Sequence, residues 1–326
     1  MPVSSILLFI SFFIVNPLIG QKIIHGHIAD EQTKKAIPFA NIGVLNSNVG
    51  TISNEDGSFS IYIPAGFSRD TIIFSAIGYA EKKILLSHLN DNQDSPILLS
   101  VNPTMLEAVT VTAVKKTKEY WLGNRYFKGG SIYADSITAG SAMALLIENK
   151  YPSFHKDFSF PAYIKKAMLR ISDNTFEEFK VRIRILEVDT ITHLPGKDLF
   201  DKNVIVTSRI KKGWLPFDLS SFQFKVNKPF FLVFEWILED DDRINLVNQF
   251  KEFQEKNPDR VTRDTMMVRG EKVPFNSYHN FVAGTFFGVS PIQFSLNNYQ
   301  SYYRNNSFGA WEKASAILTA RILLTK

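Results

Sequence analysis

Glu235 is the residue whose type and setting most suggest chemistry. It lies inside the apolar run Pro229 to Leu238, PFFLVFEWIL, which favours a central β-strand. Alternation along a strand places its side chain on the face opposite Phe234 and Trp236, toward solvent or a cleft. Glycoside hydrolysis uses two carboxylates, so Glu235 could take part in it if the fold places a second carboxylate nearby. A glycan-active or peptidase-associated enzyme is therefore one hypothesis for this chain.

Motifs that define common active sites are missing from the sequence. There is no GxSxG elbow, no HExxH, no Walker A loop and no GxGxxG that opens a helix. His155, His193 and His279 are isolated, and the chain has no Cys, which excludes disulfides, thiolate metal sites and a Cys nucleophile. We therefore predict a protein that is not an enzyme and has no catalytic residues and no cofactor.

An acidic run, Glu239-Asp240-Asp241-Asp242, follows the apolar strand. Ca²⁺ takes about six to eight oxygen ligands, and clustered Asp in a sandwich loop can supply several of them. Asp240 and Asp242 are the candidate metal ligands, and the alternative is a solvated charge run at a strand end. His25 and His27 would share one face of a strand without a third ligand, so we interpret them as polar residues on the solvated face of an edge strand.

Aromatic residues gather near the C-terminus, in a stretch rich in Asn, Ser and Gly. Exposed rings of this kind can stack on sugar rings, and Trp311, Tyr302 and Tyr303 are the candidate ligand-binding residues. The alternative is that these rings fill the end of a β-sandwich core.

The composition is that of a globular protein, and its charge is unevenly distributed. The chain has 326 residues, 45% hydrophobic and 21% charged, enough for two domains. Residues 21–114 carry 6 basic and 9 acidic residues, a net charge of −3. The remaining 31 basic and 23 acidic residues give +8, which could favour an acidic polysaccharide or a lipid headgroup. A surplus of this size also simply keeps a surface soluble.

An uninterrupted apolar run, Ile6 to Ile19, has the length of a signal-peptide core and is short for a membrane span. Gly20-Gln21 offers a small residue followed by a polar start. We predict a signal peptide at residues 1–20 and export; the family resemblance described below implies the periplasm or the outer-membrane surface as the destination. A buried N-terminal strand or helix is the alternative.

The stretch Gly50 to Tyr79 predicts a small β-sandwich at residues 21–114. Ser58 to Ile63 alternates with period two, and a turn sequence, Asn54-Glu55-Asp56-Gly57, comes before it. Seven short strands are expected in this region. They are Ile23 to Ile28, Phe39 to Val44, Gly50 to Ser53, Ser58 to Ile63, Thr71 to Ala76, Tyr79 to Leu86 and Ile97 to Leu99.

The order of several short segments carries a resemblance to a known family. These are His25-Gly26-His27-Ile28, Ile37-Pro38-Phe39-Ala40-Asn41-Ile42, Gly50-Thr51, Asn54-Glu55-Asp56-Gly57-Ser58-Phe59 and Ile77-Gly78-Tyr79. About residues 22–113 resemble the carboxypeptidase regulatory-like domain, a transthyretin/Ig-like sandwich. The resemblance implies an accessory, non-catalytic module of the kind that precedes the plug of TonB-dependent outer-membrane receptors and occurs in other exported bacterial proteins.

The segment Thr104 to Ala113, TMLEAVTVTA, resembles the short stretch that follows this domain in those receptors. There it lies near the box that pairs as an added strand with the energy-transducing protein. The alternative, which we favour, is a last strand of the sandwich. A charged linker is expected at residues 115–120.

Residues 121–326 are predicted to form a second domain, a jelly-roll-like β-sandwich. Strands are expected at Ala162 to Ile171, Phe179 to Val188 and Val204 to Ile210, with Leu194 to Leu199 as a loop. Arg182 and Arg184 would lie on the solvated face of their strand. A polar insertion with one helix, around Leu246 to Glu255, is expected at residues 245–269, and strands end the chain near Phe281 to Val289, Gln293 to Leu296 and Ile317 to Leu324. A further resemblance, to jelly-roll-type sandwiches of bacterial surface and carbohydrate-binding proteins, is carried by the order of an Arg-rich strand, Val188-Asp189-Thr190, Pro195-Gly196-Lys197-Asp198-Leu199, Gly213-Trp214, Asp218-Leu219 and the Phe230 strand.

The sequence thus predicts an all-β protein of the Gram-negative envelope that acts as a non-catalytic binding or interaction module associated with outer-membrane assemblies. Its expected partner is an envelope protein or a polysaccharide. Nucleic acid is not expected, and contact with the outer membrane would be peripheral at most. The alternative function is carbohydrate binding for polysaccharide capture.

Overall fold

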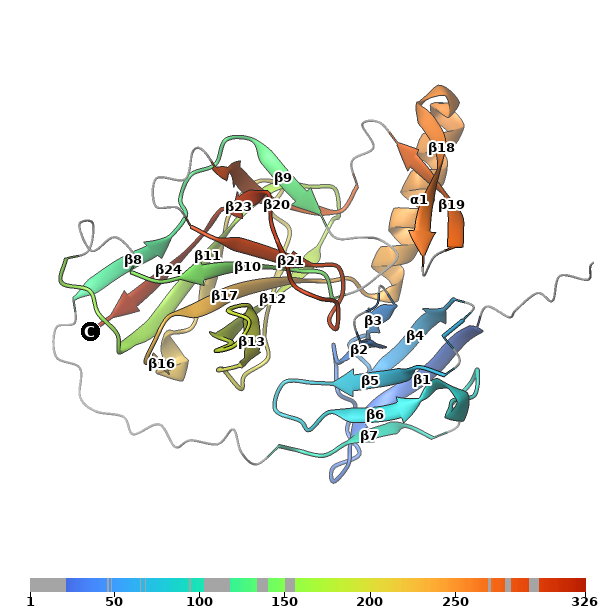
Figure 1. The fold of residues 1–326 in the computed structure, drawn as a ribbon, viewed down its shortest axis with the longest axis horizontal. Coiled ribbons are helices and arrows are strands. Elements are labelled where there is room, and N and C mark those ends of the chain that lie inside the picture. The colour runs from blue at the N-terminus through green and yellow to red at the C-terminus, as the bar shows by residue number, and fades with distance from the viewer. Residues whose placement is uncertain are drawn as a thin grey trace, which may run out of the picture.

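The structure is a computed structural model. It describes residues 22–45, 47, 49–64, 66–67, 69–93, 95–102, 118–133, 140–149, 156–268, 271–278, 283–292 and 299–326. The predicted signal peptide, the segment Thr104 to Ala113 and the predicted strand Gln293 to Leu296 lie outside the described residues. Strands dominate the described part of the chain, and the all-β prediction is confirmed (Figure 1).

The first domain is the predicted seven-stranded sandwich. One sheet has the order β4-β1-β7 and the other has the order β3-β2-β5-β6. The strands are β1 (Lys22–Asp30), β2 (Asn41–Val44), β3 (Gly50–Ile52), β4 (Ser58–Ile63), β5 (Thr71–Ser75), β6 (Lys82–Leu85) and β7 (Ile97–Leu99). Phe59 and Phe74 meet edge to face in the core, with ring centroids 5.7 Å apart. Because β1 lies between β4 and β7, the prediction that His25 and His27 belong to an edge strand was wrong, although both side chains are exposed.

The second domain is also built from two sheets. The first sheet has the order β13-β12-β17-β10-β21-β22, with β14 also pairing with β12. Its strands are β10 (Ala142–Ile147), β12 (Phe179–Val188), β13 (Pro195–Asp198), β14 (Val204–Ser208), β17 (Phe230–Ile237), β21 (Ser301–Arg304) and β22 (Glu312–Lys313). The apolar run that contains Glu235 is β17, and it lies between β12 and β10, as its composition predicts.

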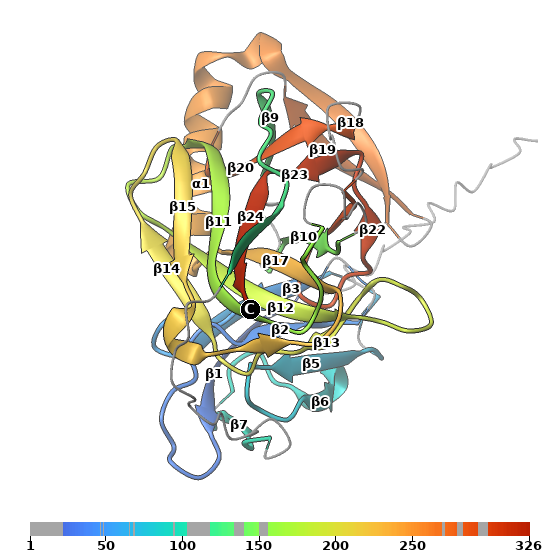
Figure 2. The ribbon, with the colours of Figure 1, turned by 90° about the vertical axis from the view of Figure 1, so that its left-hand side faces the viewer.

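The second sheet has the order β23-β20-β11-β24-β8, with β15 and β16 pairing with β11 and β9 with β20 (Figure 2). Its strands are β8 (Glu119–Gly123), β9 (Gly130–Tyr133), β11 (Ala162–Asn174), β15 (Gly213–Asp218), β16 (Lys225–Val226), β20 (Thr285–Pro291), β23 (Ala316–Leu318) and β24 (Ala320–Thr325). Glu119 and Tyr120, which the sequence assigns to the linker, are the first residues of β8.

Alternating side chains of the two sheets form one large core between them. Trp236 of β17 stacks on Phe287 of β20, with ring centroids 3.6 Å apart and the planes 9° from parallel. The Trp236 indole N–H donates to the Thr285 carbonyl at 2.8 Å, so the polar atom of a buried ring is satisfied.

A helix, α1 (Asp240–Lys256), and a hairpin, β18 (Val261–Val268) and β19 (Glu271–Tyr278), form the insertion (Figure 1). The helix starts earlier than predicted, because the acidic run provides its N-terminus. The Asp242 carboxylate accepts the Glu239 backbone N–H at 3.0 Å, and negative charge in the first turn complements the helix dipole. No helix among the described residues has the length and apolar character to cross a membrane.

Candidate functional site: the interface between the domains

The two domains meet where β2 and β3 approach the outer side of the sheet that contains β12 and β17. Phe39 and Ile52 of the first domain form a buried cluster with Ile237 of the second. The Lys180 ammonium lies over the Phe39 ring, 5.8 Å from its centroid. An apolar seam with a cation at its rim therefore joins the two sandwiches.

Arg182 crosses this interface. Its guanidinium donates to Glu235 Oε1 at 3.0 Å, Asn203 Oδ1 at 2.9 Å, Asn41 Oδ1 at 3.2 Å and the Phe39 carbonyl. Burial lowers the pKa of Arg182, and the carboxylate of Glu235 opposes that effect. One side chain of the second domain thus satisfies two oxygen atoms of the first.

Glu235 is the centre of a buried ion cluster, formed by Arg182, Arg184, Asp198, Glu235 and Arg304. Its carboxylate is 3.0 Å from Arg182 Nη1, 3.3 Å from Arg184 Nη1 and 3.6 Å from Arg304 Nη2. Glu235 and Arg182 face each other on β17 and β12, and their side chains are 0% and 2% exposed. The prediction that Glu235 points to solvent or a cleft was wrong, as was the solvated face for Arg182 and Arg184.

Two further features complete the ion cluster. Arg184 makes a bidentate pair with Asp198, at 2.9 Å and 2.6 Å. Arg304 reaches Glu235 across the small Ala142, which is paired with both residues in the sheet. Burial lowers the pKa of Arg304 to about 10, and the neighbouring Arg184 adds to the effect. Three guanidinium groups therefore share two carboxylates, and Glu235 serves as their common counter-ion.

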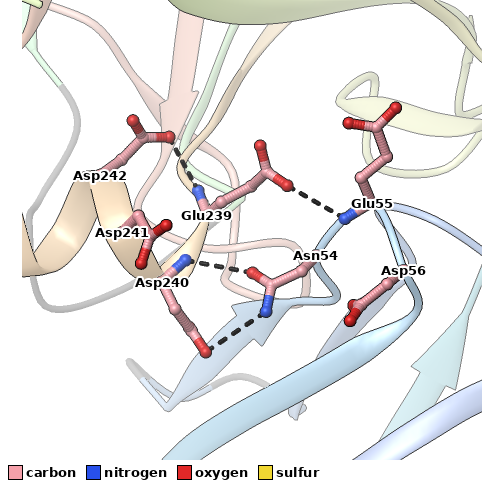
Figure 3. A pocket seen from close by; sticks show the side chains of 7 residues that line it. All are labelled: Asn54, Glu55, Asp56, Glu239, Asp240, Asp241 and Asp242. Carbon is pink, nitrogen blue, oxygen red and sulfur yellow. Dashed lines mark hydrogen bonds between the residues drawn. The ribbon is translucent and has the colours of Figure 1, made fainter.

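The turn between β3 and β4 is fixed to the N-terminus of α1 beside a cavity of about 340 Å³ (Figure 3). The Glu55 backbone N–H donates to Glu239 Oε1 at 3.0 Å. The Asp240 backbone N–H donates to Asn54 Oδ1 at 3.1 Å. The cavity is lined by Asn54, Glu55, Asp56, Glu239, Asp240, Asp241 and Asp242.

Two cations beside the cavity, Lys180 and Arg243, balance part of its negative charge. Lys180 pairs with Glu239, and Arg243 pairs with Asp240 while donating to Thr51 Oγ1 at 2.6 Å. Burial raises the pKa of Asp242, while the hydrogen bond that its carboxylate accepts from the Glu239 backbone N–H has the opposite, smaller effect. In the part of the chain that the structure describes, no group of three or more His, Asp or Glu is arranged to hold a metal ion. The Ca²⁺ site at Asp240 and Asp242 stays a prediction.

The three predicted sugar-binding rings do not form one platform. Tyr302 is buried edge to face against Phe231 on the outer side of its sheet, with centroids 5.5 Å apart. Its neighbour Tyr303 packs on the core side and donates to Glu312 Oε2 at 2.6 Å. The Arg304 guanidinium covers the Trp311 ring at 4.7 Å. Sugar binding by these residues stays a prediction, without a shared surface in the structure.

The sequence analysis does not predict the ion cluster, because its members are spread from Arg182 to Arg304 along the chain and belong to four different strands. The signal was the alternation of Arg182 and Arg184 with apolar residues in β12, matched by one carboxylate in the apolar β17. A charged residue in the middle of a strand that is otherwise wholly buried requires a partner of opposite charge on a neighbouring strand.

Comparison with known proteins assigns the first domain. Residues 24–111 match the family model described as the CarboxypepD_reg-like domain, and the resemblance inferred from the sequence is confirmed. This is a non-catalytic regulatory domain. No curated protein sequence matches the chain.

Proposed function

With a CarboxypepD_reg-like domain at residues 24–111 as the premise, we propose that the chain is a non-catalytic, exported protein of the Gram-negative envelope that binds a protein partner of outer-membrane assemblies. The observation that carries the proposal is the position of Arg182, which joins Phe39 and Asn41 of the first domain to Glu235 of the second. The regulatory-type domain is then part of one two-domain binding unit.

The state of Glu235 supports a non-catalytic role. A general acid or base needs an open path to the proton that it transfers. Both oxygens of this fully buried carboxylate accept hydrogen bonds from arginines, Oε1 from Arg182 and Oε2 from Arg184. Glu235 is therefore a structural counter-ion in this proposal.

The outward face of β1 and β4 is our candidate for the partner surface. Ile23 and Tyr62 are directly paired across these strands, and 50% and 45% of their surfaces are exposed. The contacts with the second domain come from β2, β3 and the adjoining turns, so this apolar pair remains accessible.

The test is cross-linked capture of the full chain, expressed in its source organism with an affinity tag after Lys326. We expect one envelope protein in near-stoichiometric yield, and its loss in the Ile23→Ser/Tyr62→Ser variant. Ile191→Ser is the matched control, because Ile191 is 87% exposed on a loop of the second domain. Equal capture by both variants would contradict the surface. Hydrolysis of a glycan or peptide that Glu235→Gln abolishes without unfolding the chain would contradict the function.

A further inference from the structure

The outer face of the second sheet carries aromatic and cationic side chains together. Alternate residues of β8, β11, β15 and β24 pack in the core, and those between them lie on the opposite, outer face of the sheet. These outward residues include Trp121, Lys166, Arg170, Trp214 and Arg321, each half-buried. We call them, together with Phe127, the outer-face patch.

The strand register makes the patch continuous. Trp214 of β15 is paired with Arg170 of β11, while Leu323 of β24 is paired with both Lys166 and Trp121. Paired side chains on one face of a sheet have Cβ atoms about 4.5–5.5 Å apart. Aromatic and cationic side chains therefore lie on the same face of four adjacent strands.

Two arginines of the patch lie on rings. The Arg321 guanidinium is 4.3 Å from the Trp121 ring centroid, and that of Arg170 is 5.0 Å from the Phe127 centroid. Stacking orients the planar guanidinium and leaves its N–H edge for a carboxylate or sulfate group. The Nε of Arg170 is buried and has no hydrogen-bond partner in the structure.

The positive charge of this face is largely unpaired. Among the ion pairs of the described residues, none includes Arg125, Arg170 or Arg321. Burial lowers the pKa of Arg321, and the nearby Arg125 lowers it further. Asp218, paired with Lys166 in the sheet, is the acidic neighbour on β15. An anionic ligand would relieve repulsion between cations that have no counter-ion.

We propose that the outer-face patch binds an acidic polysaccharide, with Arg170 and Arg321 holding its carboxylate or sulfate groups and the half-exposed Trp214 ring lying against a sugar ring. This goes beyond the proposed partner-binding role and uses a different surface. An extended chain suits a broad sheet face that offers charges and rings on several strands. The surplus of eight positive charges outside residues 21–114 also favours binding of an anionic ligand.

An anionic membrane is the main competing occupant. A membrane-binding face presents protruding apolar side chains beside its cations. None of the large apolar residues that are exposed in the described chain belongs to β8, β11, β15 or β24. The guanidinium groups also lie against rings, so this face offers little to insert into a bilayer.

The test measures binding of the purified full chain to polygalacturonate and dextran sulfate by isothermal titration calorimetry. Neutral dextran, phosphatidylglycerol vesicles and duplex DNA serve as comparison ligands. The Arg170→Met/Arg321→Met variant keeps an apolar stem over each ring and removes the charges. We expect it to bind at least about tenfold more weakly, because each charge-assisted hydrogen bond contributes about that factor. Arg260→Met/Arg209→Met is the control of equal charge change, since both residues are exposed and neither belongs to β8, β11, β15 or β24.

Binding of an acidic polysaccharide that the patch variant loses and the control retains supports the proposal. Equal weakening by both variants, binding only to vesicles or DNA, or no polysaccharide binding would overturn it. Trp214→Ala provides a second variant that leaves both arginines in place and is expected to weaken binding as well. Capture of the protein partner should be unchanged in the patch variant, so failure of one proposal can be told from failure of the other.

Discussion

Replacing Glu235 by Gln should destabilise the protein strongly, because the carboxylate is the shared counter-ion of the ion cluster. The side chain is fully buried between Arg182, Arg184 and Arg304. Gln keeps the shape but removes the negative charge and turns one acceptor into an N–H donor that faces a guanidinium. Asp198 would then be the one carboxylate left in the cluster.

The expected loss is about 3–5 kcal/mol, the typical cost of removing one partner from a buried ion pair. The free energy of unfolding of a domain is about 5–15 kcal/mol, so the change is easily measured. The assay is urea unfolding at pH 7, followed by fluorescence. Glu252→Gln is the matched control: its pair with Lys256 is 3.6 Å long and exposed, and its loss should cost less than about 0.5 kcal/mol.

A second substitution separates the loss of charge balance from a general packing defect. Arg304 has two nitrogen atoms, Nε and Nη2, without a hydrogen-bond partner. Adding Arg304→Met to Glu235→Gln should therefore restore part of the stability, with a coupling energy of about 1–3 kcal/mol. A loss below about 1 kcal/mol for Glu235→Gln, or no recovery in the double variant, would refute the role of Glu235 as counter-ion.

Three further predictions concern the interface and its surroundings. Asn41→Ala should cost about 1–3 kcal/mol in thermal or urea unfolding, because it leaves a buried donor of Arg182 without its acceptor; an unchanged midpoint would count against this contact. Gly140→Ala should cost at least about 2 kcal/mol in urea unfolding, since Gly140 has φ +82° and a Cβ there would lie 1.9 Å from Ser307 Oγ; a neutral result would disprove the close approach. Asp242→Asn should be more stable than the wild type at pH 7, because the pKa of Asp242 is raised in the folded state and ionisation therefore destabilises the fold. The difference should shrink as the pH falls to about 4, where the carboxyl is increasingly protonated in the wild type. A difference in melting temperature that is independent of pH would contradict this prediction.

Much of the fold could be predicted, because alternation and turn chemistry are local. Ser58 to Ile63 and Phe179 to Val188 alternate cleanly, and both are strands with the predicted bounds. The loop expected at Leu194 to Leu199 contains β13, because pairing with β12 overrides its Pro and Gly. The polar composition of the insertion predicts one helix and does not predict the hairpin of β18 and β19 that follows it.

The candidate site was harder to predict, because it depends on what covers a sheet. Alternation correctly gives Arg182 and Glu235 the face opposite the core of their sandwich. It cannot show that Phe39 and Asn41, more than a hundred residues away, close over that face. In the same way, the sequence of the acidic run does not show that Asn54, far away in the chain, accepts the Asp240 backbone N–H at the start of α1. Contacts between domains have no local period in the sequence.

The most direct test of the central claim, that the two sandwiches form one binding unit joined through Arg182, is differential scanning calorimetry of the full chain. We predict a single unfolding transition for the wild type. We predict two separate transitions for Arg182→Met, because the hydrogen bonds to Phe39 and Asn41 are lost and Glu235 loses its closest counter-ion. Two transitions in the wild type, or a single unchanged transition in the variant, would contradict the claim.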